Sequence, residues 1–207
     1  MKVFVFGGNE GAGEHVLKKL AAKGHEAVTI AETENRAEEL EMLGAADVII
    51  SKDGHFTNAI DGSEAIIYMA GSSLGAGEDQ ETLVDYGTVR KSLEEAQRHK
   101  IERLVYLSPV RTDESPESKE TGEKDEPEEW IKKSQLAYTV IRTTKRVSKP
   151  GKEMITAKET IADSNGEIPY EDVAAVLVEA LDNQNTFRKA FEITAGDTSI
   201  EEALDSL

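Results

Sequence analysis

The chain lacks cysteine altogether, contains few histidines, and has no long hydrophobic run. Without cysteine the protein has no disulfides, no thiolate nucleophile and no thiolate metal ligands. Its four histidines, at positions 15, 25, 55 and 99, are scattered, so we expect no metal site. No run approaches the roughly 18 apolar residues that a membrane span needs. Because Met1 leads directly into a predicted strand without a signal-peptide pattern, we expect a cytoplasmic protein with no membrane partner.

Basic residues are scarce relative to acidic ones. The 24 Lys and Arg residues stand against 41 Asp and Glu residues, which gives a net charge of −17. A field of this sign repels phosphate backbones, so nucleic acid is not an expected partner. Part of the excess is local, because residues 113–129 contain nine acidic side chains and two lysines, a net charge of −7. With little to bury, residues 109–126 are predicted to form a mobile acidic loop.

Short apolar runs alternate with segments of helical periodicity along the whole chain. This alternation predicts one doubly wound α/β domain over residues 1–207, with a parallel sheet covered by helices on both faces. The predicted strands are Val3–Phe6, Ala27–Ile30, Asp47–Ile50, Ala65–Met69, Leu104–Leu107, Tyr138–Ile141 and Ala190–Thr194. The predicted helices are Gly13–Ala22, Asn35–Leu43, Thr82–His99, Pro127–Ser134, Glu171–Leu181 and Ile200–Leu207, with a short turn near Phe56–Ile60.

The most informative of these elements come first: an apolar strand, a glycine-rich turn and a helix. Val3–Phe6 leads into Gly7-Gly8-Asn9-Glu10-Gly11-Ala12-Gly13, where the helical pattern begins. Glycines permit a tight turn and a close backbone approach, and the N–H groups at the start of a helix attract a pyrophosphate. The turn therefore predicts dinucleotide binding. A tight connection between strand and helix, without any ligand, is the alternative interpretation.

Taken in order along the chain, the turn and the later motifs resemble the short-chain dehydrogenase/reductase superfamily. The nearest group is its small epimerase-like and nitrogen-metabolite-repressor-like NAD(P)-binding proteins. The resemblance extends over essentially the full length, and its later markers include Ala70-Gly71-Ser72, Leu136–Arg142 and Ile168–Ala175. It implies a Rossmann-like fold that binds NAD or NADP. It also implies reductase or isomerase activity, although some members of such families only sense the cofactor.

The resemblance further implies a cofactor site at the first turn and at two later strand ends. Gly7 and Gly13 match the first and third glycines of the family pattern Gly-x-x-Gly-x-x-Gly, whereas Glu10 replaces the second. A carboxylate at this position opposes a pyrophosphate unless it turns toward solvent. The expected cofactor-binding residues are Gly7, Gly8, Asn9, Gly11, Ala12, Gly13, Glu32, Ala70, Gly71 and Ser72.

Glu32 bears on which dinucleotide binds. It stands at the end of the second predicted strand, where an acidic side chain accepts hydrogen bonds from the adenosine ribose and excludes a 2′-phosphate. This position favours NAD over NADP. The alternative interpretation is an exposed glutamate in the first turn of a helix.

The catalytic residues of the superfamily are largely replaced. The superfamily uses a Tyr-x-x-x-Lys pair with a supporting Ser, and no Tyr-x-x-x-Lys occurs in this chain. Counting back from the resembling segment puts Lys124 at the family's Lys and Glu120 at its Tyr. Pro109 takes the Ser position, with Ser108 one residue before it. Ser108 and Lys124 are therefore the remaining catalytic candidates.

Three functions are compatible with these residues. The first is an NAD(P)-dependent oxidoreductase or epimerase-like enzyme of the atypical short-chain dehydrogenase type, acting on an unknown small molecule. Hydride transfer to a quinone-like or flavin-like acceptor, with water supplying the proton, needs no tyrosine. The second is a catalytically silent dinucleotide sensor, and the third is a cofactor-free scaffold or binding protein. The oligomeric state is left open.

Overall fold

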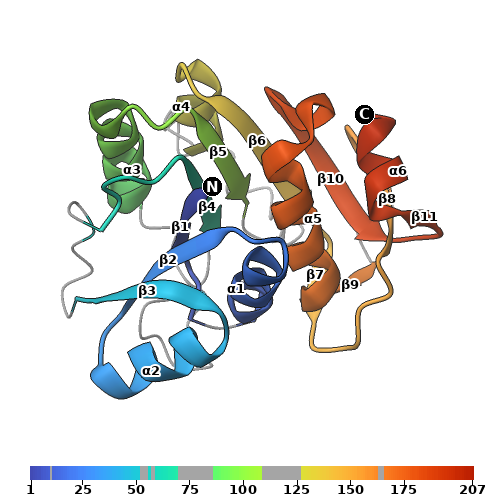
Figure 1. Ribbon diagram of the computed structural model, residues 1–207. Coiled ribbons are helices and arrows are strands. Elements are labelled where there is room, and N and C mark those ends of the chain that lie inside the picture. Colours follow the sequence, from blue (N-terminus) through green and yellow to red (C-terminus); the bar gives the residue numbers. More distant parts are fainter. Residues whose placement is uncertain (10, 52–55, 57–58, 70–85, 109–126, 163–165) are drawn as a thin grey trace, which may run out of the picture.

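The computed structural model describes residues 1–9, 11–51, 56, 59–69, 86–108, 127–162 and 166–207 (Figure 1). Its strands are β1 (Lys2–Phe6), β2 (Glu26–Ala31), β3 (Ala45–Ile50), β4 (Ala65–Met69), β5 (Arg103–Leu107), β6 (Ala137–Thr143), β7 (Lys145–Val147), β8 (Met154–Lys158), β9 (Glu167–Pro169), β10 (Lys189–Ala195) and β11 (Thr198–Ser199). Its α-helices are α1 (Ala12–Ala22), α2 (Glu34–Met42), α3 (Tyr86–His99), α4 (Pro127–Lys133), α5 (Tyr170–Asp182) and α6 (Ile200–Asp205), with a 3-10 turn at Gln184–Thr186. The predicted acidic loop 109–126 lies outside the described residues.

The main sheet has nine strands in the order β11-β8-β10-β6-β5-β4-β1-β2-β3. The seven strands from β3 to β10 pair in parallel, while β8 and β11 extend the sheet in antiparallel fashion. The order runs outward from β1 in both directions, which defines a doubly wound fold. The seven parallel strands are the seven predicted from the sequence, with ends shifted by a residue or two, so the predicted fold class is confirmed.

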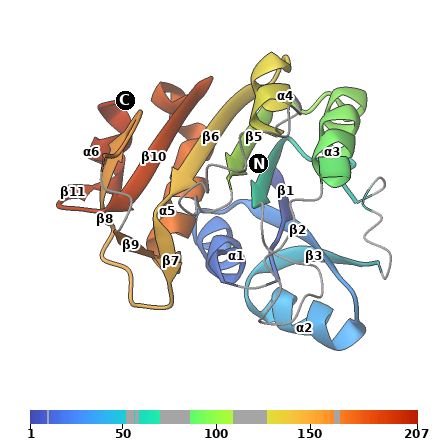
Figure 2. The same ribbon diagram turned by 180° about the vertical axis from the view of Figure 1, so that it is seen from behind.

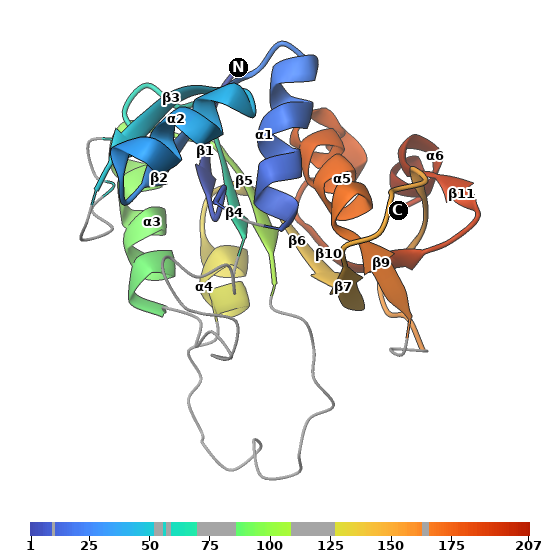
Figure 3. The ribbon, with the colours of Figure 1, turned by 90° about the horizontal axis from the view of Figure 1, so that it is seen from below.

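Side chains of β1 alternate between two separate cores. Val3 and Val5 are fully buried with α1, α5 and α6 on one face of the sheet, whereas Phe4 and Phe6 pack with α3 and α4 on the other. Figures 2 and 3 show the two layers, with α1 and α5 side by side on one face and α3 and α4 on the other. Because strands buried on both faces are apolar throughout, β1, β4 and β5 read as continuous hydrophobic runs.

The segment between β6 and α5 contains structure that the sequence pattern did not predict. β7 and β9 form a separate parallel pair in which Arg146 lies opposite Ile168, and β8 joins the main sheet beside β10. Each of these strands has only three to five residues. Runs this short show little periodicity, so their partners elsewhere in the chain define them.

Arg103, at the amino end of β5, is a buried cation that joins the sheet to the far end of α5. Its guanidinium donates hydrogen bonds to the main-chain oxygens of Ala180 and Leu181 and to the hydroxyl of Thr139 in β6. It also stacks over the Phe187 ring, 4.3 Å from the ring centroid. Burial lowers the pKa of Arg103 to about 10, so the side chain remains charged at neutral pH. The carbonyls at the carboxyl end of a helix attract cations, so this arginine holds α5 in register with the sheet.

Candidate functional site

The candidate site lies where the sheet order reverses, between β1 and β4. The loops after these strands lead to helices on opposite faces of the sheet. In doubly wound folds ligands bind outside the carboxyl ends of the strands at this position. The loop after β1 and the carboxyl ends of β2, β5 and β6 therefore border the candidate site.

The loop after β1 is built around glycines. Gly7 leaves β1 with a φ of 81°, and Gly11 caps the start of α1 with a φ of 55°. A Cβ atom at Gly13 would lie 2.0 Å from the Gly7 carbonyl oxygen, and one at Gly8 would lie 2.7 Å from the Thr29 hydroxyl of β2. Only glycine lets α1 begin this close to β1. The predicted strand, turn and helix are present. The helix begins at Ala12, one residue earlier than predicted, and Ala12 is buried.

Asn9 stands in the middle of this loop with unused hydrogen-bonding capacity. Its main-chain oxygen accepts a hydrogen bond from Arg36 of α2. Its side-chain Oδ1 is buried and has no hydrogen-bond partner in the part of the chain that the structure describes. An unused acceptor at this position suits a ligand that offers a hydroxyl or amino hydrogen, because an unpaired buried polar atom is costly. Glu10, the next residue, lies outside the described residues.

Arg36 is a charged residue of the site that the sequence analysis missed. Its guanidinium binds Glu14 of α1 and Glu39 of α2, each at 2.6 Å, in addition to the Asn9 carbonyl. The hydrogen bond to Glu14 raises the pKa of Arg36 above its usual value. Two carboxylates therefore already neutralise Arg36. Glu32 follows β2 and is exposed, and its predicted role at the adenosine ribose stays a prediction.

A second polar group lies at the carboxyl ends of β5 and β6. Arg142 of β6 binds Glu128 of α4 through two nitrogens, one of them at 3.0 Å, and both side chains are largely buried. Although burial opposes it, the hydrogen bonds and charge of Arg142 hold the pKa of Glu128 below its usual value, and a hydrogen bond from Ser108 adds to this effect. The candidate Ser108 is thus next to a carboxylate that the sequence analysis did not select. The other catalytic candidate, Lys124, lies outside the described residues, as do Ala70, Gly71 and Ser72.

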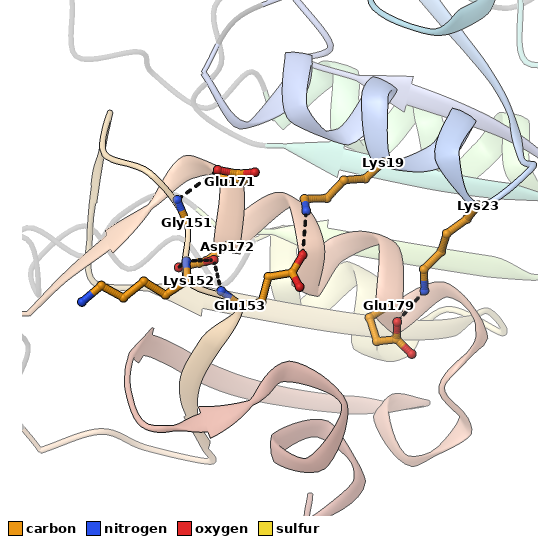
Figure 4. Close-up of polar contacts among 8 residues, drawn as sticks. All are labelled: Lys19, Lys23, Gly151, Lys152, Glu153, Glu171, Asp172 and Glu179. Carbon is orange, nitrogen blue, oxygen red and sulfur yellow. Dashed lines mark hydrogen bonds and ion pairs between the residues drawn. The ribbon is translucent and has the colours of Figure 1, made fainter.

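The start of α5 lies beside the glycine-rich loop, because its first residue, Tyr170, adjoins Gly11. Two carboxylates of its first turn bind the chain that follows β7, as Figure 4 shows. Asp172 accepts hydrogen bonds from the main-chain N–H groups of Lys152 and Glu153 at 2.8 to 3.1 Å, and Glu171 accepts one from Gly151 at 3.0 Å. A carboxylate in the first turn of a helix also interacts favourably with the helix dipole. These contacts fix the amino end of α5 next to the glycine-rich loop.

Two ion pairs on the same side join α1 to its neighbours. Lys19 binds Glu153 at 3.2 Å, and Lys23 binds Glu179 of α5 at 2.5 Å (Figure 4). Exposed pairs of this kind contribute little to stability, roughly 0–1 kcal/mol each. These pairs orient α1 relative to α5. The first residue of α5, Tyr170, lies next to the glycine-rich loop. A Cβ atom at Gly11 would lie 3.3 Å from the Tyr170 ring.

One large cavity in the described part of the structure lies away from this site. A cavity of about 950 Å³ lies between α3 and α4 at the amino ends of β5 and β6, and its lining includes Leu93, Trp130, Leu136 and Arg188. It is therefore at the opposite edge of the sheet from the glycine-rich loop. Within the described residues there is no group of three side chains arranged to hold a metal ion. Over those same residues, no helix combines the length and the apolar character needed to cross a membrane.

The parallel sheet, the order of its strands and the glycine-rich loop define a dinucleotide-binding protein of the Rossmann-like class. A family model described as NAD(P)H-binding matches residues 7–184. The chain therefore belongs to this NAD(P)H-binding family, as an atypical member of the short-chain dehydrogenase/reductase type, and the predicted resemblance is confirmed.

Similar proteins agree with this family assignment. The sugar epimerase YhfK of Bacillus subtilis (strain 168), whose activity is uncharacterised, is 30% identical over 216 residues that cover 100% of both chains. A solved structure from Bacillus halodurans, provisionally described as an NAD-dependent epimerase/dehydratase, is 29% identical and superposes with a TM-score of 0.87 over 100% of both chains. The oxidoreductase YlbE of Lactococcus lactis, 20% identical, superposes with a TM-score of 0.78 over 100% of this chain and 96% of its own. This last likeness shows the fold alone.

Proposed function

We propose that this protein binds NAD(H) over the glycine-rich loop and transfers hydride between it and a small organic molecule, without a catalytic tyrosine. The observation that supports this most directly is the close approach of Gly13 to Gly7, which sets the start of α1 against β1. The N–H groups of the first turn of α1 are then available to a pyrophosphate. When bound, the nicotinamide supplies the hydride donor or acceptor, so the protein needs to position the second substrate rather than activate it.

Ser108 is the residue best placed to orient that substrate. Its hydroxyl is hydrogen-bonded to the Glu128 carboxylate, which accepts the hydroxyl hydrogen because an ionised carboxylate cannot donate. The oxygen lone pairs of Ser108 remain able to accept a hydrogen bond from a substrate hydroxyl. Glu128 in turn is fixed by Arg142. In this proposal Ser108 positions the substrate, and the proton comes from water.

The preference for NAD(H) over NADP(H) is the finer part of the proposal. A 2′-phosphate needs a free cation, but Arg36 is already bound by Glu14 and Glu39. Glu32 adds a further negative charge where the adenosine ribose would lie. The two carboxylates on Arg36 and the charge of Glu32 favour ribose hydroxyls, which can donate hydrogen bonds, over a phosphate, which these carboxylates repel.

The first test is a calorimetric titration of the purified protein with NADH and with NADPH at moderate salt. Micromolar binding of NADH, followed by loss of dihydronicotinamide absorbance when quinones and flavins are offered, would support the enzyme. Saturable binding without turnover on any acceptor or sugar nucleotide would favour the catalytically silent sensor. Absence of binding into the millimolar range would contradict the proposal and favour a cofactor-free binding protein.

The cofactor preference is tested by releasing Arg36. In the double variant Glu14→Gln/Glu39→Gln the guanidinium is freed, and we expect affinity for NADPH relative to NADH to rise by about tenfold, the effect of one charge-assisted hydrogen bond. Glu32→Arg should shift the ratio in the same direction. Glu38→Gln, an exposed carboxylate on the same helix, is the matched control and should leave the ratio unchanged. An unchanged ratio in both test variants would show that these carboxylates do not select the cofactor.

A further inference from the structure

Arg146 is a charged residue of β7 that has no role in the proposed function. It is the central residue of β7 and is half-buried, whereas its neighbour Lys145 is exposed. In the parallel pair of β7 and β9 it lies opposite Ile168. Side chains at paired positions of neighbouring strands project from the same face. Ile168 is fully buried in the core that also contains Ala12 and Val16 of α1, so Arg146 points toward the side of the sheet on which α1 lies.

Tyr170 links Arg146 to the loop. This tyrosine begins α5 directly after β9, and its ring is the nearest neighbour of the space above Gly11. An ionised Tyr170 would raise the pKa of Arg146, so the two side chains lie near each other. The order in space is therefore Arg146, Tyr170 and then the amino end of α1, where the pyrophosphate of a bound dinucleotide would lie.

The guanidinium of Arg146 lacks a partner within the described part of the chain. Burial lowers its pKa, and no hydrogen bond or carboxylate there compensates for the loss of water. The two nearby lysines differ, because Lys145 and Lys149 both bind Glu167, at 3.7 and 2.6 Å. In a protein with a net charge of −17, an arginine left half-buried without a carboxylate is unusual.

We propose that Arg146 binds the pyrophosphate of the dinucleotide at the amino end of α1, on the side of the loop where Tyr170 lies. An arginine presents several N–H donors in a planar fork that fits phosphate oxygens. In a chain with a net charge of −17, this arginine would supply positive charge to an anionic ligand. This inference rests on the proposed dinucleotide binding and adds a residue from outside the loop to that site.

The test compares Arg146→Met with Lys145→Met. Both variants remove one positive charge from β7, but Lys145 is exposed and bound to Glu167. We expect Arg146→Met to raise the dissociation constants of NADH and of ADP-ribose by about 10- to 100-fold, as for the loss of a hydrogen bond between charged groups. Lys145→Met should leave both constants within about twofold of the wild type. Arg146→Lys, which keeps the charge but not the fork, should fall between Arg146→Met and the wild type.

The melting temperature without ligand separates binding from a structural role. Because the guanidinium is half-buried and unpaired, Arg146→Met should melt at or above the wild-type temperature. A fall of several degrees would show that Arg146 supports the fold and would overturn the inference. An unchanged dissociation constant for NADH in Arg146→Met, with normal binding by the wild type, would overturn the inference alone. If the wild type binds neither NADH nor ADP-ribose, the proposed function fails, and the role of Arg146 fails with it.

Discussion

Replacing Gly13 by alanine tests whether the close contact between β1 and α1 is what makes the site. The new methyl carbon would lie 2.0 Å from the Gly7 carbonyl oxygen and 2.7 Å from the Gly8 Cα atom. Both are backbone atoms of the loop, so no side chain can rotate away to relieve the contact. The amino end of α1 would have to move away from β1 by more than about 1 Å to restore ordinary van der Waals separation.

The size of the effect follows from two opposing contributions. Overpacking of this kind costs typically about 1–3 kcal/mol, and a contact with the backbone belongs at the upper end. Alanine regains up to about 1 kcal/mol of helix propensity at this position in α1. We therefore expect a net loss of about 2 kcal/mol, which for a chain of this size lowers the melting temperature by about 4–8 °C. Binding of NADH should weaken by at least about tenfold, because the displaced N–H groups no longer converge on the phosphate.

Gly24→Ala is the matched control. A Cβ atom there meets nothing within 4 Å, but the residue has a φ of 76°, which alanine adopts at a cost of about 1–2 kcal/mol. The two variants should therefore lose similar stability by circular dichroism melting, whereas only Gly13→Ala should lose NADH affinity by calorimetry. If Gly13→Ala keeps both its melting temperature and its affinity, the close packing of the loop is not what supports the site.

Two further predictions concern the buried charges. Arg103→Met should lower the free energy of unfolding, measured in urea titrations, by about 3–5 kcal/mol, because the carbonyls that end α5 lose their donor. As a control, replacing the exposed Arg90 by Met should change the free energy of unfolding by less than about 0.5 kcal/mol. For Glu128 the folded-state pKa is depressed below its usual 4.5, so its contribution to stability is present above that pH and is lost as the pH falls through the folded-state pKa. Glu128→Gln should therefore be less stable than the wild type at neutral pH by about 2 kcal/mol, and this difference should shrink in urea titrations below about pH 4.5. A constant difference at all pH values would contradict the role assigned to the carboxylate charge.

The local pattern of the chain was enough to predict the central fold. β1, β4 and β5 are continuous apolar runs because both of their faces are buried, and such runs are visible without knowing their neighbours. The glycine-rich turn was equally visible, since the contact that requires glycine at Gly13 involves residues only six positions away. The family resemblance carried by these same segments is confirmed by the family model.

The polar contacts of the candidate site were not predictable in the same way. Arg36 reaches Glu14 across 22 positions, Arg142 reaches Glu128 across 14, and Tyr170 meets Gly11 across more than 150. In each case the residue has an ordinary interpretation in sequence, as a solvated charge on a helix or strand or as an aromatic at a helix start. Which carboxylate an arginine meets depends on how the helices pack, and no local pattern encodes that distance.

By itself, then, the sequence determined the doubly wound sheet, the two-faced core and the loop that approaches a ligand, because hydrophobic periodicity and glycine placement act over a few residues. The tertiary structure alone decided which charges are neutralised and which are left to bind. It neutralised Arg36 with two carboxylates, placed Ser108 beside Glu128, and left Arg146 half-buried in β7. The reason is that electrostatic pairing depends on separations of a few ångströms between residues far apart in the chain, and folding sets those separations.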